Sequence, residues 1–324
     1  MPRAPSVDVV RGFAILWMVL FETLDIFSSE FDLWNRYWYA FGFDIINWVS
    51  LFMLVAGVGI KLSVDSQLKK GKGKIGTFVR GLRRYLFYLG LSLFLCLWVA
   101  DIGLFLSLGE FPGAFSIYAI ITLVLVLIVE NHTSVLLILT YGISFFLQEY
   151  VSYFLIGLKI SPFFYGFTVW NILPFMITGV YVAHMIDQSN KKSMLKLFAA
   201  LLPVALVLLF LGDFPSYFNG TISYAVDDIL IIVALFVSLL VLLPRLPQAS
   251  RFFGFFGRYS IVFYVAHVAL WYKLLLILDK VKTFDLAQSI LLTLASIAVS
   301  TIFILFWRKL GRARVVSRAT GHIK

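Results

Sequence analysis

Ten long apolar stretches, joined by shorter polar linkers, constrain the fold of this chain more than any other feature of its sequence. They cover residues 9–29, 41–63, 84–105, 113–130, 134–148, 165–186, 194–212, 222–243, 258–278 and 286–307, the fifth being the shortest. A helix needs roughly 20 mostly apolar residues to cross a bilayer core about 30 Å thick. Because the apolar residues form continuous runs and do not alternate, they predict helices and exclude an outer-membrane barrel. The sequence therefore predicts an all-α, polytopic membrane bundle of about ten transmembrane helices.

The composition supports this fold class. Hydrophobic residues make up 61% of the 324 residues and charged residues only 14%, whereas soluble domains have roughly 45–50% and 25%. So many crossings leave no length for a separate soluble domain, and residues 1–324 are predicted to form one transmembrane domain. Cys96 is the only cysteine, which excludes an intrachain disulfide or a cysteine-bound metal cluster. The first apolar stretch is full length and lacks a small-residue cleavage site, so we expect no cleavable signal peptide.

The basic residues indicate how the chain is oriented. If the helices cross alternately, most of the 27 Lys and Arg residues fall on one side, in residues 61–84, 187–196 and 244–258 and at both termini. The positive-inside rule places that side in the cytoplasm, so both termini are predicted to be cytoplasmic in a multi-pass protein of the cell membrane. The net charge of +10 thus reports topology, and membrane lipids, not nucleic acid, are the expected partners. The segment KKGKGK, Lys69–Lys74, is predicted to be a flexible basic loop.

The first apolar stretch carries four ionisable residues, which are expensive inside a membrane and usually face a cavity or a partner. Asp8 and Arg11 lie three residues apart near its start, and Glu22 and Asp25 lie three apart near its end. Eleven residues separate Arg11 from Glu22, a rise of about 16 Å and close to three helical turns. All four side chains are therefore predicted to share one stripe that faces the bundle interior. For Asp8 and Arg11, a structural ion pair is an equal alternative to a binding role.

Further polar residues fall in the outer halves of other predicted helices, and one histidine lies near the middle of the ninth: Asp44, Asn47, Asp101, Asn171, Asp227, Asp228 and His267. They predict an acidic outer vestibule with one deep imidazole, in a cavity lined by helices one, two, six, eight and nine. A carboxylate or an imidazole placed there can act as a general base or acid.

A structural role is the alternative for several of these groups. Asp101, Asp227 and Asp228 can simply lie at the membrane interface, and a lone histidine in an apolar helix is often a hydrogen-bonded interior residue. The other three histidines, His132, His184 and His322, have no metal-ligand spacing with one another. No metal site is predicted.

Four segments carry motifs. SVDVVRGFAILWMVL (Ser6–Leu20) has the pattern S-x-D-x-x-R-G before an apolar run, and Asp44 precedes LFMLVAGVGIKLS (Leu51–Ser63). GLRRYLFYLGLSL (Gly81–Leu93) starts with basic residues, and GRYSIVFYVAHVALW (Gly257–Trp271) has the pattern G-x-x-S-[IL]-x-x-Y-[VL]-x-H. In this order, the segments resemble the heparan-α-glucosaminide N-acetyltransferase-like proteins, which together with the acyltransferase-3 branch belong to the transmembrane acyltransferase superfamily. Residues 100–250 resemble this family only in hydropathy and helix count.

The resemblance implies a bundle of ten or eleven helices that binds acetyl-CoA from the cytosolic side and acetylates an acceptor at the opposite face. The CoA phosphates would meet basic residues at the cytoplasmic helix ends, here Arg11, Arg83 and Arg84, with Lys61 as a further candidate. Guanidinium groups suit phosphates because they donate hydrogen bonds in a fixed fork. The sequence therefore predicts an acyl-CoA-dependent membrane acyltransferase that acts on a hydroxyl or amine acceptor, a small molecule or glycan.

Two positions depart from the resemblance. In the acyltransferase-3 branch an Arg is followed, after ten residues, by a catalytic His, and here that position, counted from Arg11, is Glu22. The acetyltransferase branch has a loop His ten residues before the Asp that matches Asp44, and here that position is Trp34 in a loop without His. Glu22 is therefore predicted to deprotonate the acceptor, with Asp44 orienting or relaying and His267 holding the thioester end or the acceptor. Acceptor recognition is assigned to Asp25, Asn47, Asn171 and Asp228.

Two other classes of function stay open at this point. A proton- or cation-coupled transporter would use the same carboxylates as a relay, and Asn171–Pro174 with Gly179 would permit the broken helix typical of transporter sites. No matching interruption is found in a second half of the chain. A non-catalytic relative that keeps the fold to bind lipid or a partner is the third reading. A homodimer is compatible with all three.

Overall fold

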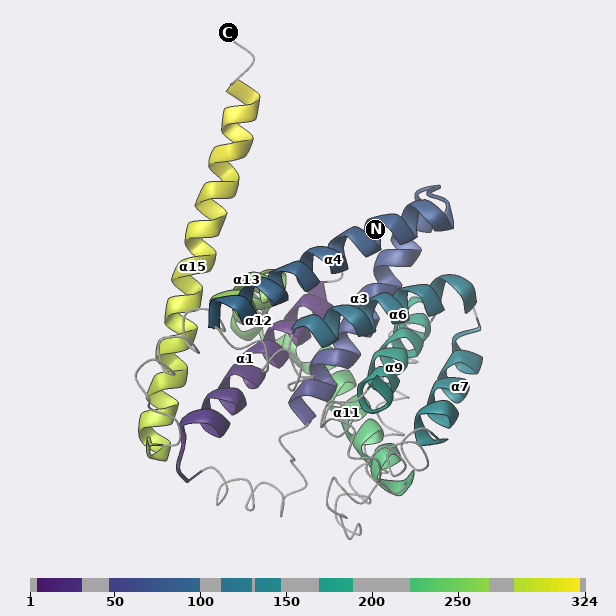
Figure 1. Ribbon diagram of the computed structural model, residues 1–324, viewed down its shortest axis with the longest axis horizontal. Helices are drawn as coiled ribbons and strands as arrows, with labels where there is room; N and C mark the ends of the chain where they lie inside the picture. Colours follow the sequence, from purple (N-terminus) through teal and green to yellow (C-terminus); the bar gives the residue numbers. More distant parts are fainter. Residues whose placement is uncertain are drawn as a thin grey trace.

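The computed structural model of the chain describes residues 5–30, 47–99, 112–129, 132–146, 169–188, 222–267 and 283–320. In these residues the regular structure is helical, apart from an isolated parallel bridge between Ser28 and Phe284. The helices are shown in Figure 1 and are α1 (Pro5–Phe27), α3 (Asn47–Lys69), α4 (Lys74–Val99), α6 (Pro112–Val129), α7 (Thr133–Phe146), α9 (Val169–Gln188), α11 (Ile222–Leu242), the short η4 (Leu243–Arg245), α12 (Pro247–Arg258), α13 (Ser260–His267) and α15 (Leu286–Thr320).

The all-α prediction is confirmed within this part of the chain. Each predicted stretch except 194–212, which lies outside the described residues, overlaps one of these helices. By length and composition, Ser50–Lys69 and Leu286–Phe306 are apolar enough to cross a membrane. The number of ten crossings and the cytoplasmic location of the termini stay predictions.

The basic segment between the second and third predicted helices is more helical than expected. The helix α3 continues to Lys69 and α4 already begins at Lys74, so that most of the basic residues in this segment lie on helices. Only a short turn joins them, in which the Gly71 N–H donates to Leu68 O at 2.9 Å. Gly71 has a φ of 75°, a conformation that ends helices and that glycine adopts without strain. The expected loop is therefore a turn between two helices.

A second difference lies in residues 244–258, which the charge pattern assigns to a linker. Residues Pro247–Arg258 form the helix α12, which starts with a proline in its first turn, where the missing N–H has no helical partner to lose. Because α12 leads into α13 across Tyr259, it determines where the helix that carries His267 begins.

The helix α1 packs directly on the backbone of α12. A Cβ at Gly12 would collide with the carbonyl of Phe253, and a Cβ at Gly257 would collide with the carbonyl of Asp8. Small residues allow such close approach between helices in membranes. A similar contact joins α3 and α9, where Gly57 meets the backbone of Met176 and Gly179 meets that of Leu54. These two glycine contacts bring four helices together around the interior side chains.

The helix α9 runs without interruption through the segment that would permit a transporter-like break. It extends from Val169 to Gln188 with Pro174 inside it. Thr178, one turn later, also donates its hydroxyl to Pro174 O at 2.8 Å. The break that Asn171–Pro174 and Gly179 would permit is not found in this helix.

The helix α15 has the polarity of a helix surrounded by lipid. Its buried face carries hydroxyl groups while its exposed faces carry large apolar side chains. The buried residues include Ser289, Thr293, Ser296 and Ser300, and the exposed ones include Ile290, Leu291, Leu294, Ile302, Leu305 and Phe306. Water would favour the reverse arrangement, whereas lipid accepts apolar side chains and leaves hydroxyl groups to the helix interfaces.

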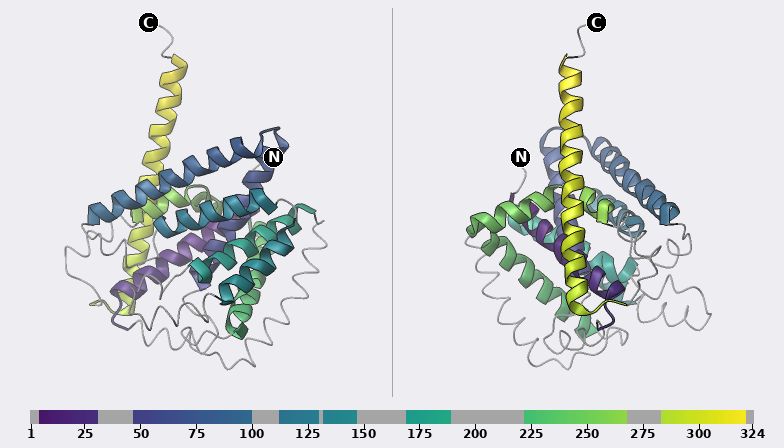
Figure 2. Two further views of the ribbon diagram at one scale, coloured as in Figure 1. Left: turned by 45° about the vertical axis from the view of Figure 1, so that its right-hand side comes forward. Right: turned by 90° about the vertical axis from the view of Figure 1, so that its left-hand side faces the viewer.

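The end of α1 is tied to the start of α15. The Phe284 N–H donates to Phe27 O at 3.0 Å, and the Ser29 N–H donates to Phe284 O at 2.9 Å. From this junction the two helices run at an angle to each other while staying in contact, and α15 extends beyond the other helices at its far end (Figures 1 and 2). The C-terminal end of α1 and the N-terminal end of α15 are therefore held together at the same end of the molecule.

Candidate active site

A carboxylate and an imidazole meet inside the bundle. Glu22 Oε2 on α1 lies 3.3 Å from His267 Nε2 on α13. The side chain of His267 is 2% exposed and that of Glu22 is 14% exposed. An ionisable group in such surroundings needs a partner, and each of these two supplies it for the other.

The second ring nitrogen of His267 reaches a third helix. His267 Nδ1 lies 2.7 Å from the hydroxyl oxygen of Ser296 on α15, and Ser296 is itself buried. Acid, imidazole and hydroxyl therefore form one row that connects α1, α13 and α15. This is an arrangement in which a proton can be held at a defined atom and exchanged with a bound group.

Glu22 and His267 lie within ion-pair distance, but their contact does not have the geometry of a hydrogen bond. Within the part of the chain that the structure describes, Glu22 Oε2 and His267 Nε2 are both buried without a hydrogen-bond partner. Buried polar atoms are nearly always satisfied in native proteins, and an exception calls for an explanation. Catalytic hydrogen bonds are often long without substrate and shorten when it binds. The unmet hydrogen-bonding capacity of these two atoms makes the pair a candidate functional site.

Packing explains why these residues meet. Phe263, one turn before His267, is fully buried and packs edge-to-face on Phe256 of α12, with ring centroids 5.2 Å apart. The two rings belong to an apolar cluster with Met18 and Val19 of α1. This cluster holds α13 against α1 one turn away from Glu22. The close contact of α12 with Gly12 fixes the position of α12 along α1, and α13 follows directly after α12.

At the other end of α1, Arg11 forms the ion pair that the spacing predicts. Arg11 Nη1 lies 3.3 Å from Asp8 Oδ1, and the Arg11 side chain is 20% exposed. Its Nη2 lies 2.7 Å from the point where Gly59 of α3 would carry a Cβ, so the glycine leaves room for the guanidinium group. Asp8 is buried, and Arg11 and Glu22 are partly buried. The predicted stripe also includes Asp25, whose side chain is not described, so the stripe stays a prediction.

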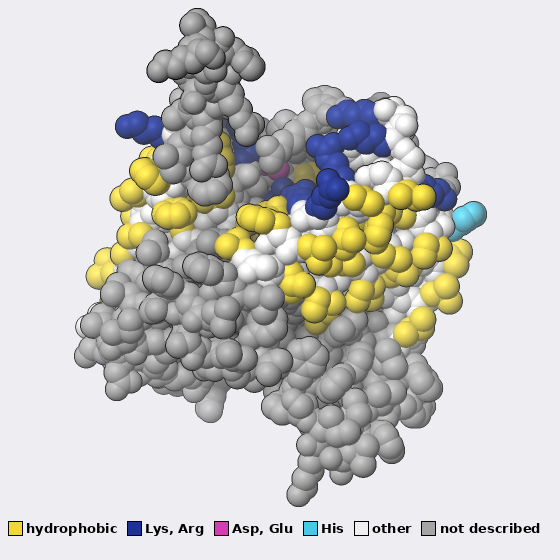
Figure 3. All heavy atoms as spheres, turned by 45° about the horizontal axis from the view of Figure 1, so that its top comes forward, with side chains coloured by type: hydrophobic (Ala, Val, Ile, Leu, Met, Phe, Trp, Pro, Cys, Tyr) yellow, Lys and Arg dark blue, Asp and Glu magenta, His cyan; other side chains and the backbone are white. Residues whose placement is uncertain are grey.

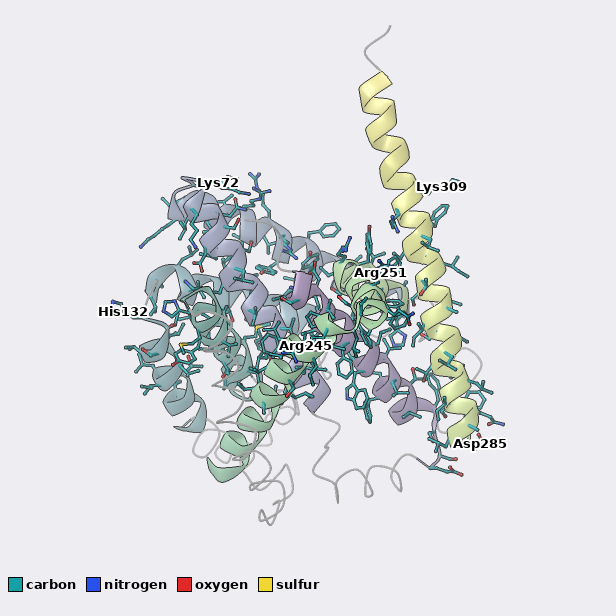
Figure 4. The ribbon with its side chains drawn as sticks, turned by 180° about the vertical axis from the view of Figure 1, so that it is seen from behind. Lys72, His132, Arg245, Arg251, Asp285 and Lys309 are labelled. Carbon is teal, nitrogen blue, oxygen red and sulfur yellow. The ribbon has the colours of Figure 1, made fainter. Side chains whose placement is uncertain are left out.

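Basic residues gather at this same end. Lys61, buried on α3, lies 2.9 Å from Asp65 Oδ1. Arg83 and Arg84 are exposed on α4, and Arg84 Nε donates to the Tyr88 hydroxyl at 2.9 Å. Figure 3 shows a cluster of Lys and Arg side chains above a broad hydrophobic surface. Figure 4 places Lys72 and Lys309 toward one end of the molecule and Asp285 toward the opposite end.

Other predicted site residues are not described at the level of side chains. Asp44 and Asp101 lie outside the described residues, as does Trp34. The remaining ones lie on described helices, but their side chains are not described: Asp25 on α1, Asn47 on α3, Asn171 on α9, and Asp227 and Asp228 on α11. Their assignment to the acceptor, and the predicted vestibule and cavity, stay predictions. Among the described residues no group of His, Cys, Asp and Glu could hold a metal ion.

Sequence reasoning missed Ser296. Its only signal is the recurrence of hydroxyl residues at positions 289, 293, 296 and 300, with the spacing of one helix face, inside the last apolar stretch. That spacing predicts a polar stripe but not which hydroxyl meets a histidine. The choice depends on how α13 and α15 pack.

Fold and site together define a helical membrane protein with a buried acid–imidazole–hydroxyl row and a basic end. The sequence model of a family described as an acyltransferase domain matches residues 5–306, nearly the whole chain. The chain belongs to this family, acyltransferase-3, a family of membrane acyltransferases. No curated protein matches the sequence. The resemblance to the transmembrane acyltransferase superfamily is thereby confirmed, and acyltransferase-3 is the branch to which the chain belongs.

Proposed function

We propose that this protein transfers an acyl group, most simply acetyl, from cytosolic acyl-CoA to a hydroxyl or amine acceptor at the opposite membrane face, with a sugar as one acceptor of this kind. The observation that carries the proposal is the buried pair of Glu22 and His267, 3.3 Å apart, in a chain of the acyltransferase-3 family. Acyl transfer from a thioester needs a base for the acceptor and good positioning of both substrates. The pair supplies the base, and the helices around it supply the positioning.

Glu22 is the base in this proposal. It is the more exposed member of the pair, and it stands where the acyltransferase-3 branch has a catalytic His. An imidazole is nevertheless present, because α13 brings His267 to the same place. The acceptor O–H or N–H gives its proton to the Glu22 carboxylate, the acceptor atom forms a bond to the thioester carbonyl carbon, and the C–S bond breaks to release CoA.

His267 has a different role from the predicted one in this proposal. A side chain that is 2% exposed, with its two nitrogens facing Ser296 and Glu22, is poorly placed to hold a thioester. We assign it to holding the Glu22 carboxylate in position and supporting its charge. Asp44, which lies outside the described residues, keeps its predicted role in orienting the acceptor or relaying its proton.

The donor is assigned to the opposite end of α1. Arg11, Arg83 and Arg84, with Lys61 as a further candidate, offer charge-assisted hydrogen bonds to the CoA phosphates. Arg11 lies eleven residues before Glu22 on the continuous helix α1, a rise of about 16 Å. The extended pantetheine arm of CoA separates phosphate from thioester on this scale, so phosphates near Arg11 are compatible with a thioester near Glu22.

The test uses the purified protein in detergent or nanodiscs. Acetyl-CoA is expected to raise the melting temperature of the wild type, and to raise it less in a variant with both Arg83→Ala and Arg84→Ala. Lys309→Ala, which removes an exposed charge on α15, is the matched control and should respond as the wild type does. Absence of stabilisation by acetyl-CoA, together with no acyl transfer to any hydroxyl or amine acceptor supplied, would contradict the proposal.

A further inference from the structure

A histidine offers different chemistry depending on which ring nitrogen carries its proton. His267 has one nitrogen 2.7 Å from the Ser296 hydroxyl and the other 3.3 Å from Glu22 Oε2. If Nδ1 carries the proton, a bare Nε2 faces a carboxylate oxygen and two lone pairs oppose each other. If Nε2 carries it, an N–H points toward the carboxylate.

The serine hydroxyl decides between these two forms. Among the described residues, His267 is the hydrogen-bond partner that the structure gives to Ser296. A buried hydroxyl that accepted from Nδ1–H would leave its own hydrogen without an acceptor, which is unfavourable. A hydroxyl that donates to Nδ1 satisfies its hydrogen and leaves Nε2 to carry the proton. In the second form the hydroxyl hydrogen has Nδ1 as its acceptor, and the Nε2 hydrogen lies toward the Glu22 carboxylate oxygen 3.3 Å away.

We propose that Ser296 is a positioning residue that fixes His267 in the form protonated on Nε2, so that an N–H always faces Glu22. The inference rests on the proposed function of Glu22 as the base. An N–H beside the carboxylate can hold it in the orientation in which it takes the proton of a bound acceptor.

The other hydroxyls on this face of α15 do not share the role. The Thr293 hydroxyl donates to Ser289 O at 2.9 Å, within its own helix. Ser300 is buried like Ser296 and lies one turn further along, with no hydrogen bond to His267 among the described contacts. Ser300 has the same side chain as Ser296 and is equally buried, but it lacks the contact with His267. Ser300→Ala is therefore the matched control.

The direct test measures the tautomer by nitrogen NMR with 15N-labelled histidine. The chain has four histidines, and the His267→Asn variant identifies the signals of His267 by their loss. Wild type, Ser296→Thr and Ser300→Ala are expected to show His267 protonated on Nε2. Ser296→Ala is expected to show a mixture of both tautomers. A Ser296→Ala protein with the wild-type nitrogen shifts, or a wild type protonated on Nδ1, would overturn the inference.

A kinetic test follows from the same idea. Ser296→Ala is expected to lower kcat by about 10–100-fold, the usual effect of removing a group that orients a functional side chain, with the KM for acetyl-CoA unchanged. Ser296→Thr should restore most of kcat, and Ser300→Ala should keep it. If kcat of Ser296→Ala equals that of the wild type, the positioning role is wrong while the acyltransferase proposal stands. If the wild type does not use acyl-CoA at all, the proposed function fails, and the NMR experiment still decides the tautomer.

Discussion

Glu22 and His267 lie on helices from opposite ends of the chain, yet their side chains approach to 3.3 Å in the interior. Neither atom of the contact has a hydrogen-bond partner among the described residues, and in the proposed function a bound acceptor supplies one.

Replacing Glu22 by Gln should remove the base and keep the shape of the side chain. We expect kcat to fall by about 100-fold or more, since general base catalysis contributes roughly 10²–10⁴, and the melting temperature to change little. Glu30→Gln, which neutralises an exposed carboxylate just after the same helix, is the control and should leave kcat unchanged. Unchanged turnover of Glu22→Gln at saturating acceptor would exclude Glu22 as the base.

Glu22 and His267 should be energetically coupled. We expect the single variants Glu22→Gln and His267→Gln each to reduce stability or activity, and the double variant to lose less than the sum. Residues in direct contact show coupling energies of about 0.5–3 kcal/mol. The measurement is a double-mutant cycle on the melting transition and on kcat, and strictly additive effects would mean that the two groups act independently.

The backbone contact between α1 and α12 should tolerate no side chain at Gly257. In Gly257→Ala the new Cβ would collide with the Asp8 carbonyl, and we expect a loss of about 1–3 kcal/mol of stability, as for other overpacked sites. Gly254→Ala in the same helix is the control, because its Cβ would meet Val9 Cγ2 at an ordinary 3.5 Å. Equal thermal stability of the two variants would show that the close contact contributes nothing.

The space that Gly59 leaves for Arg11 should matter for the donor. A Cβ in Gly59→Ala would lie 2.7 Å from Arg11 Nη2 and displace the guanidinium group. Losing one hydrogen bond to a charged group, about 1.5 kcal/mol or more, corresponds to roughly a tenfold weaker interaction. We therefore expect the KM for acetyl-CoA to rise by about tenfold with a smaller change in kcat. Gly90→Ala on α4, where a Cβ meets nothing within 4 Å, should leave both constants as they are.

The helices were the predictable part of the fold, because long apolar runs allow few alternatives in a membrane. The prediction was wrong where basic residues were assigned to linkers although they lie on helices. The basic residues around Lys61 and Arg80 continue the helices α3 and α4 beyond the apolar part, since Lys and Arg are good helix formers and their charges reach water from a helix surface. The helix α12 was missed for a related reason, because its two arginines and two glycines interrupt the apolar pattern.

The candidate site was predicted one residue at a time. Glu22 and His267 were each identified as polar residues in apolar surroundings, and the ion pair of Asp8 with Arg11 followed from spacing within a single helix. The meeting of Glu22 with His267 depends on the packing of α1, α12 and α13, which periodicity does not contain. Ser296 was missed because a buried serine on a membrane helix is ordinary by composition and becomes informative only through its neighbour.

The hydrogen bond between Phe284 and Phe27 joins a helix that is synthesised first to one that is synthesised last. A chain is synthesised from its N-terminus, and its early segments enter the membrane before the late ones exist. Glu22 therefore enters the membrane before its partners are synthesised. The imidazole of His267 follows with α13, and the hydroxyl of Ser296 follows with α15. A chain that stops before α13 leaves Glu22 without the imidazole, and a chain that stops between α13 and α15 leaves His267 without the Ser296 hydroxyl.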